Sequence, residues 1–183
     1  IMPPISLPSI AALLEKENFK VKITECIGDN LNLEDIEREI KGFHPTLIIV
    51  NVSTATYYND KKVITFIRNI TPCHLTAIGI HVTALPENVL LDTALDSVVR
   101  GEPEAVCLGL ADSIAKGNGF KNIEGLSYKE KGKVVHNRRK NFIEDLNSLP
   151  FPARNLLNNR RYTLPIINRP YTLVISSRGC PYE

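Results

Sequence analysis

The chain has 183 residues, of which 43% are hydrophobic and 23% charged, and its formal net charge is +2. These values describe an ordinary globular domain with an appendage, and 22 Lys and Arg against 20 Asp and Glu leave no basic surface for a nucleic-acid partner. No apolar run reaches the roughly 18 residues that span a bilayer, and no signal peptide opens the chain. We therefore expect a cytoplasmic location without a membrane partner.

Helices and strands alternate in the first two thirds of the chain. Apolar residues at helical spacing predict helices over residues 9–17, 33–41, 60–69, 85–95 and 103–115, with Gly42 as the stop of the second. Runs rich in β-branched residues predict strands over residues 20–26, 46–52, 75–80 and 97–100, and the nearly continuous run at 46–52 is typical of a strand covered on both faces. This order predicts an α/β fold with a doubly wound, Rossmann- or flavodoxin-like, mostly parallel sheet. We expect an initial strand just upstream of residue 1.

The pattern changes after residue 118. Residues 123–128 and 133–136, joined by a turn that contains Gly132, predict a small β-hairpin appendage. Two prolines within residues 145–152 predict an extended connector, and residues 171–176 predict a strand that opens a following domain. The expected division is a sheet domain over residues 1–118, a hairpin and Pro-rich connector over 119–170, and the start of a barrel over 171–183.

The four cysteines, Cys26, Cys73, Cys107 and Cys180, are scattered without a CxxC pair, which argues against a zinc site or disulfide framework complete within this chain. Cys26 and Cys107 lie in apolar runs and are expected to be small buried hydrophobes, whereas the role of Cys73 is open. Cys180 differs from them, because it lies between glycine and proline in a turn that would expose a thiolate.

Several motifs occur together in a specific order. They are Gly79-Ile80-His81-Val82-Thr83-Ala84-Leu85-Pro86-Glu87, Val98-Val99-Arg100-Gly101-Glu102-Pro103-Glu104, Leu149-Pro150-Phe151-Pro152-Ala153-Arg154 and Ser177-Arg178-Gly179-Cys180-Pro181-Tyr182. In this order the chain resembles, over nearly its whole length, the amino-terminal B12-binding (cobalamin-binding) domain of radical SAM iron-sulfur proteins.

The resemblance implies cobalamin as the ligand of this part of the protein. It also implies that Cys180 is the first of three metal-binding cysteines in a CxxxCxxC loop, inside which the chain ends. The [4Fe-4S] cluster, S-adenosylmethionine and a small-molecule substrate then belong to the full-length parent, whose barrel domain is the expected partner. We expect this chain itself not to be catalytic and the parent to be a radical SAM methyltransferase or an oxidoreductase-like enzyme.

Ligands of open parallel sheets bind beyond the carboxyl ends of the strands. Small, hydroxyl-bearing and polar residues at that edge would let the amide groups of a corrin, or a nucleotide tail, approach the backbone. The alternatives are structural: Ser53 and Thr54 would cap the next helix, Gly79 would end a strand, and Glu102 would favour the start of a helix through its dipole. The candidate cofactor-binding residues are Ser53, Thr54, Thr56, Gly79, His81, Thr83, Gly101 and Glu102, with Asn51 beside them.

The chain departs from the family pattern at two places. Where cobalamin carriers of the methionine synthase type have an Asp-x-His-x-x-Gly loop that supplies the lower ligand to cobalt, this chain has Met2-Pro3-Pro4-Ile5-Ser6. Where a glycine pair is usual, it has Ile78-Gly79. Cobalamin would therefore bind without a protein histidine ligand, and His81, which leaves a different loop, is expected to be a hydrogen-bonding group.

Two other functions follow from the same pattern. One is a cobalamin-free α/β domain that recognises a substrate or partner within a radical SAM protein. The other, an independent flavodoxin-like nucleotide binder, is disfavoured because no glycine-rich phosphate loop follows the first strand.

Overall fold

The computed structural model describes residues 2–139 and 142–179. They belong to two compact units, which are described separately: unit 1 comprises Ile1–Leu31 and Ile143–Glu183, and unit 2 comprises Asn32–Phe142. No helix in these described ranges is long and apolar enough to cross a membrane.

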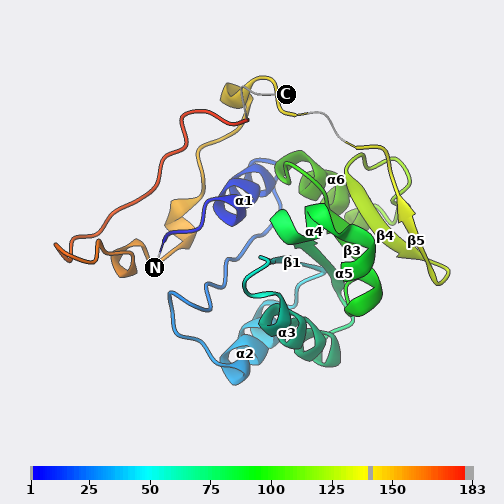
Figure 1. Ribbon diagram of the computed structural model, residues 1–183, viewed down its shortest axis with the longest axis horizontal. Coiled ribbons are helices and arrows are strands. Elements are labelled where there is room, and N and C mark those ends of the chain that lie inside the picture. Colours follow the sequence, from blue (N-terminus) through cyan, green and yellow to red (C-terminus); the bar gives the residue numbers. More distant parts are fainter. Residues whose placement is uncertain (1, 140–141, 180–183) are drawn as a thin grey trace. The chain divides into compact units, whose positions relative to one another are not determined.

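Unit 2 contains the sheet and the helices that connect its strands (Figure 1). Its capping residues are those that helix physics favours: Asn32 and Asp35 form a reciprocal capping box at the start of the first of these helices, and Pro86 occupies a first-turn position of another. In chain order the elements are α2 (Leu33–Phe43), β1 (Leu47–Asn51), α3 (Tyr57–Ile70), β2 (His74–Ile78), α4 (Ile80–Ala84), α5 (Pro86–Asp92), β3 (Ser97–Val99), α6 (Glu104–Ala115), β4 (Leu126–Glu130) and β5 (Lys133–His136).

The five strands form one sheet in the order β1-β2-β3-β4-β5. β1 pairs with β2 and β2 with β3 in parallel, while β3–β4 and β4–β5 are antiparallel. The α/β, Rossmann-like fold expected from the sequence is confirmed. The hairpin is not a separate appendage, because β4 continues the sheet beside β3, with Val98 opposite Ser127.

Burial is greatest in the middle of this sheet. Leu75, Ala77, Val98 and Leu126 are fully buried, and all three residues of β3 are buried. β1 is only half-buried, which corrects the expectation of a strand covered on both faces. Among the described strands β1 is an edge strand, with a neighbour on one side alone.

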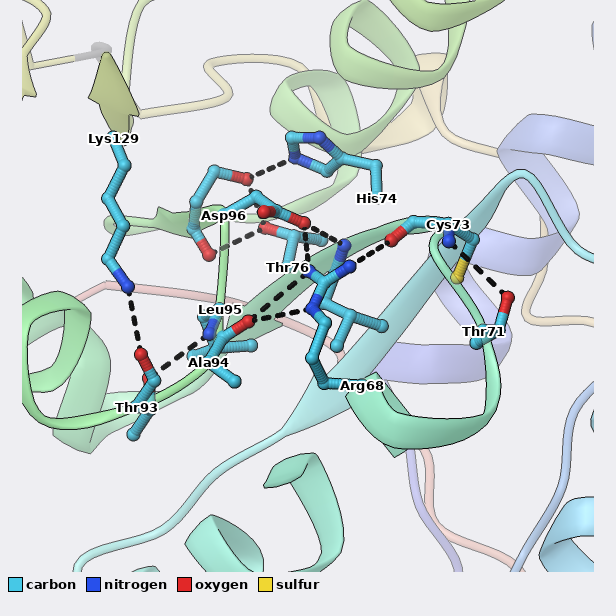
Figure 2. A network of polar contacts seen from close by, with 12 residues as sticks. Arg68, Thr71, Cys73, His74, Thr76, Thr93, Ala94, Leu95, Asp96 and Lys129 are labelled. Carbon is cyan, nitrogen blue, oxygen red and sulfur yellow. Dashed lines mark hydrogen bonds and ion pairs between the residues drawn. The ribbon is translucent and has the colours of Figure 1, made fainter. Parts of the chain in front are cut away.

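A network of polar contacts fixes the amino ends of β2 and β3 (Figure 2). The Arg68 guanidinium, from α3, donates to the backbone oxygens of Cys73 and Ala94 and pairs with Asp96. Asp96 also accepts from the Leu75 amide at 2.7 Å. Charge-assisted bonds of this kind to main-chain groups hold the helix, the strand start and the α5–β3 turn together.

The same end of the sheet holds a half-buried histidine, His74. The ring Nε2 of His74 lies 2.8 Å from Ser97 Oγ, and that hydroxyl donates to Thr76 Oγ1 at 2.9 Å. The His74 ring meets Phe120 edge-on, with 5.0 Å between centroids. Burial lowers the pKa of His74, and Arg68 acts in the same direction although Asp96 opposes it.

Unit 1 is built from α1 (Ser6–Lys16), short 3-10 helices and extended segments. Its apolar cluster consists of Ala11, Ala12 and Ala153, against which Val21, Ile23 and Leu156 pack. The Ala153 amide donates to the Pro8 carbonyl at 2.9 Å, so the connector returns to the first helix. The 3-10 helices are Leu146–Ser148, Arg154–Leu156 and Asn159–Arg161.

A second contact joins the connector to the amino-terminal segment within unit 1. Tyr162 is 2% exposed, and its hydroxyl would lie 3.4 Å from a Cβ added at Gly28. Arg161 pairs with Asp29 and donates to the Gly28 carbonyl. Burial, followed by the charges of Glu25 and Asp29, raises the pKa of Tyr162 to about 12.

Several predicted boundaries differ from the structure. Residues 20–26 do not form a strand; their apolar residues Val21 and Ile23 pack on the alanine cluster instead. Residues 171–176 do not form a strand either, because they pair with no strand among the described residues. Gly42 lies inside α2, which ends at Phe43. The C-cap is His44, in the left-handed conformation (φ 53°), and its amide donates to the Ile40 carbonyl. The short helix α4 was not predicted.

Candidate functional site

The predicted site residues lie in three loops at one edge of the sheet. Since β1, β2 and β3 are parallel neighbours, their carboxyl ends meet at the same edge. None of the eight is buried: Ser53, Thr54, Thr56 and Gly101 are exposed, and the other four are partly exposed. Ser53, Thr54 and Thr56 follow β1; Gly79, His81 and Thr83 follow β2; Gly101 and Glu102 follow β3.

The loop after β1 is organised by its own hydroxyls. Ser53 Oγ lies 2.8 Å from Thr56 Oγ1 and accepts from the Thr56 amide at 3.3 Å. Thr56 Oγ1 in turn donates to Asp60 at 2.6 Å, in the first turn of α3. These bonds order the entry to α3, although its N-cap residue is Thr56 and no described side chain makes a capping hydrogen bond there.

Gly79 brings the β1 and β2 loops into backbone contact. Its φ of 119° is one that side chains rarely adopt, and an added Cβ would lie 2.3 Å from the Val52 carbonyl oxygen. Only glycine fits here, since the clashing atom is main chain and cannot swing away. Gly79 therefore does more than end a strand: it sets the distance between two of the three loops.

Thr83 connects the second loop to the third. Its hydroxyl donates to the Gly79 carbonyl at 2.9 Å and accepts from the Gly101 amide at 3.1 Å. Gly101 has a φ of 82°, and an added Cβ would meet no atom within 4 Å. The space beside Gly101 is thus open, while its backbone is fixed by Thr83.

His81 connects the first loop to the second. Its Nδ1 lies 3.2 Å from Thr54 Oγ1, and its ring packs against the Tyr57 ring with 4.3 Å between centroids. The expectation that His81 is a hydrogen-bonding group is therefore met by the contact with Thr54.

Sequence reasoning missed the residues behind His81. Tyr57, the first residue of α3, donates its hydroxyl to Asp92 at 2.8 Å, and Lys61 pairs with the same carboxylate. Burial, followed by the hydrogen bond to Asp92, raises the pKa of Tyr57 to about 12, and the bonds from Lys61 and Tyr57 lower the pKa of Asp92. Tyr57 and Asp92 are 35 positions apart, so no local spacing indicates the pair.

The acidic residues after β3 have different environments. Glu104, in the first turn of α6, is 2% exposed, whereas Glu102 is partly exposed. Carboxylates here are favoured by the helix dipole, although the N-cap of α6 is Pro103 and no side chain among the described residues makes a capping hydrogen bond.

The predicted metal ligand Cys180 lies outside the described residues, as do the three residues after it. The cysteines that the structure describes, Cys26, Cys73 and Cys107, are free. Cys107 is fully buried, and burial raises the pKa of its thiol. Cys26 is only half-buried. Within the described ranges no three His, Cys, Asp or Glu side chains gather to hold a metal ion.

The hollow along α6 is a different feature. It has a volume of about 630 Å³ and is lined by α6 residues such as Asp112 and by residues 118, 119 and 121–124. None of the eight predicted residues lines it, so the loop edge and this hollow are separate candidates.

A family model described as the B12 binding domain matches residues 1–111. The matched segment includes all eight candidate residues and the three loops that carry them. The chain belongs to the B12-binding domain family, as expected from its sequence.

A curated relative and two solved structures extend this finding. A methyltransferase of Pyrococcus horikoshii, described as uncharacterised, is 34% identical over 183 residues, which make up 99% of this chain and 39% of that protein. The chain thus spans about two fifths of the length of this relative.

Both solved structures are radical S-adenosylmethionine enzymes. TsrM from Kitasatospora setae, with cobalamin and a [4Fe-4S] cluster bound, has a TM-score of 0.67 and 22% identity over 75% of this chain and 29% of its own. The cobalamin-dependent enzyme OxsB, with aqua-cobalamin bound, has a TM-score of 0.73 and 18% identity over 84% of this chain and 22% of its own. At these identities the likeness establishes the fold.

Proposed function

We propose that this chain is the cobalamin-binding accessory domain of a radical SAM [4Fe-4S] enzyme and holds the corrin at the carboxyl ends of β1, β2 and β3. The observation that carries the proposal is the linked edge itself. Three loops are tied together through Gly79, Thr83 and the Thr54–His81 contact, yet their polar side chains remain at the surface. An edge that is ordered and still accessible is what a large planar ligand requires.

The residues present fit the chemistry of a corrin. Its periphery carries carboxamides, which both donate and accept hydrogen bonds. The hydroxyl oxygens of Ser53, Thr54 and Thr56 have lone pairs that can accept from the carboxamide N–H groups, whereas the Thr56 proton is already donated to Asp60. Open space beside Gly101 lets a ligand approach the backbone, and Ile80, 84% exposed, offers an apolar surface to the ring. When bound, cobalamin supplies methyl-group or rearrangement chemistry, while these residues bind and orient it.

The proposed binding mode has no histidine ligand to cobalt. Residues 2–6 contain no histidine, and the Nδ1 of His81 already lies against Thr54. We therefore assign His81 to the periphery of the ligand and not to the metal.

The activity of the whole protein is part of the proposal. We infer that Cys180 begins the CxxxCxxC loop of a radical SAM barrel, which would use the [4Fe-4S] cluster and S-adenosylmethionine to act on a small-molecule substrate. The division at residues 118 and 170, a cytoplasmic location and the lack of a nucleic-acid partner belong to the same proposal. Support comes from the relative of which this chain makes up 39%.

The test is retention of cobalamin. The purified chain is mixed with hydroxocobalamin and passed over a gel-filtration column, and the visible spectrum of the protein peak is recorded. We expect about one corrin per chain. Protein that elutes without corrin bands contradicts the proposal and favours the alternative of a cobalamin-free recognition domain.

A matched pair of glycines locates the site. Gly101→Leu fills the open space at the loop edge and should reduce the affinity at least tenfold. Gly132→Leu is the control, because Gly132 has a similar φ of 77° and an equally open environment, but in the β4–β5 turn. An equal loss of affinity in both variants would show that cobalamin does not bind at the loop edge.

A further inference from the structure

The surroundings of His81 hold its imidazole on two sides. Thr54 Oγ1 contacts Nδ1 at 3.2 Å, and the ring of Tyr57 lies against the imidazole at 4.3 Å, inclined by 37°. Tyr57 cannot turn away freely, because its hydroxyl is bonded to Asp92, which Lys61 also holds. These contacts come from the β1 loop, α3 and α5, so three elements fix a side chain carried by the short helix α4.

The second ring nitrogen of His81 remains available. In an imidazole the two nitrogens point away from each other, so contact at Nδ1 directs Nε2 away from Thr54. Within the described part of the chain no hydrogen bond reaches Nε2, and His81 is partly exposed. The partner of one ring nitrogen decides whether the other carries the proton.

We propose that Thr54 and Tyr57 are positioning residues that hold His81 as the tautomer with its proton on Nε2, which then donates a hydrogen bond to a carboxamide oxygen of the bound corrin. Thr54 does so by donating its hydroxyl to Nδ1, and Tyr57 by restricting rotation of the ring. This inference rests on the proposed function. It gives Tyr57, Asp92 and Lys61 a role at the site although none of them need touch the ligand.

The first measurement is made without cobalamin. Long-range proton–nitrogen NMR correlations of the uniformly ¹⁵N-labelled chain report the tautomer of each histidine, and the signals of His81 are identified as those missing in His81→Gln. We expect the proton on Nε2 and an Nδ1 shift that changes in Thr54→Val. A proton on Nδ1 overturns the inference.

The second measurement is the affinity for hydroxocobalamin. Thr54→Val and Tyr57→Leu should each weaken binding about five- to tenfold, the range for one lost hydrogen bond, and Tyr57→Phe less, because it keeps the ring. Thr65→Val and Tyr58→Phe are the matched controls: the Thr65 hydroxyl bonds only the Lys61 carbonyl, and Tyr58 is 82% exposed. If Tyr57→Leu does not fold, the affinity of Thr54→Val alone tests the inference.

The outcomes separate the two proposals. Retained cobalamin with unchanged affinity in Thr54→Val and Tyr57→Leu overturns the present inference and leaves the proposed function standing. A wild-type chain that retains no cobalamin overturns both, whatever the tautomer of His81.

Discussion

The two ends of β2 and β3 are built differently. At the amino ends, Arg68 and Asp96 bond to main-chain groups of neighbouring elements (Figure 2). The half-buried His74 contacts Ser97 and Phe120 there. At the carboxyl ends, side chains bond mainly to one another or to loop backbone, and the hydroxyls stay at the surface. Side chains that satisfy buried backbone fix the fold, whereas those that link exposed loops shape a surface.

Residues at the carboxyl ends of the strands can therefore change with less loss of stability than those at the amino ends. A scaffold whose loops carry the site can alter its ligand by altering those loops, provided that the opposite end holds the strands in register. Mutations at the amino ends should therefore act on stability alone, and those at the carboxyl ends chiefly on binding. Gly79 should be the exception.

The largest expected effect is a loss of stability at Gly79, although this residue lies at the carboxyl ends of the strands. Gly79→Ala places a Cβ against the Val52 carbonyl at an unfavourable φ, and we expect the free energy of unfolding in urea to fall by about 4 kcal/mol. Gly42→Ala is the control, because it adds a Cβ with no atom within 4 Å inside α2 and should raise stability by about 0.5–1 kcal/mol. A loss below about 1 kcal/mol at Gly79 would contradict the close approach of the loops.

A smaller loss of stability is expected at Arg68, at the amino ends of the strands. Arg68→Met leaves the carbonyls of Cys73 and Ala94 and the Asp96 carboxylate without their donor, and should lower the free energy of unfolding by about 2 kcal/mol. The affinity for cobalamin should not change. Arg38→Met, which removes an arginine with a 74% exposed side chain, should cost less than about 0.5 kcal/mol. Weaker cobalamin binding in Arg68→Met would show that the two ends are coupled.

The smallest effect concerns pH. Because the pKa of His74 is lower in the folded chain than its ordinary 6.5, protons bind the unfolded chain preferentially. The free energy of unfolding should then decrease as pH falls below about 6.5, by at most about 1.4 kcal/mol per pH unit, and level off below the folded pKa. His74→Gln should flatten this slope in urea titrations between pH 5 and 7, whereas His44→Asn, at an exposed left-handed position, should not. An unchanged slope in His74→Gln would show that other titratable groups cause the pH dependence of stability.

Much of the fold could be predicted from local sequence patterns. The apolar run at β1, the helical spacing in α2 and the proline at the start of α5 each identified an element, because each property acts over a few residues. The strand predicted at residues 20–26 was wrong. Val21 and Ile23 pack on the alanine cluster, but the segment does not pair with any described strand. Alternation of apolar and polar residues with a period of two therefore indicates that one side of a segment is buried. Hydrogen bonding to a neighbouring strand decides whether that segment forms a β-strand.

The site was predictable in part for a similar reason. Loops after parallel strands must gather at one edge, so Ser53, His81 and Gly101 could be placed together from topology. Their individual contacts could not. The contact of Tyr57 with His81 and Asp92 depends on how α3 packs against α4 and α5, and the need for glycine at Gly79 depends on a carbonyl from another strand.

The β4–β5 hairpin has a consequence for the behaviour of the chain in concentrated solution. β5 is the last strand in the described order, and the outer edge of such a strand is a template for pairing with another chain. Here the strand begins at Lys133, and the turn before it contains Lys131 in a left-handed conformation. Lysines at such an edge disfavour pairing with an identical edge of a second molecule, although Glu130 lies opposite Lys133 across the hairpin. We therefore expect the β5 edge to be less prone to strand-to-strand pairing in concentrated solution than the edge strand β1, whose residues Leu47–Asn51 carry no charge.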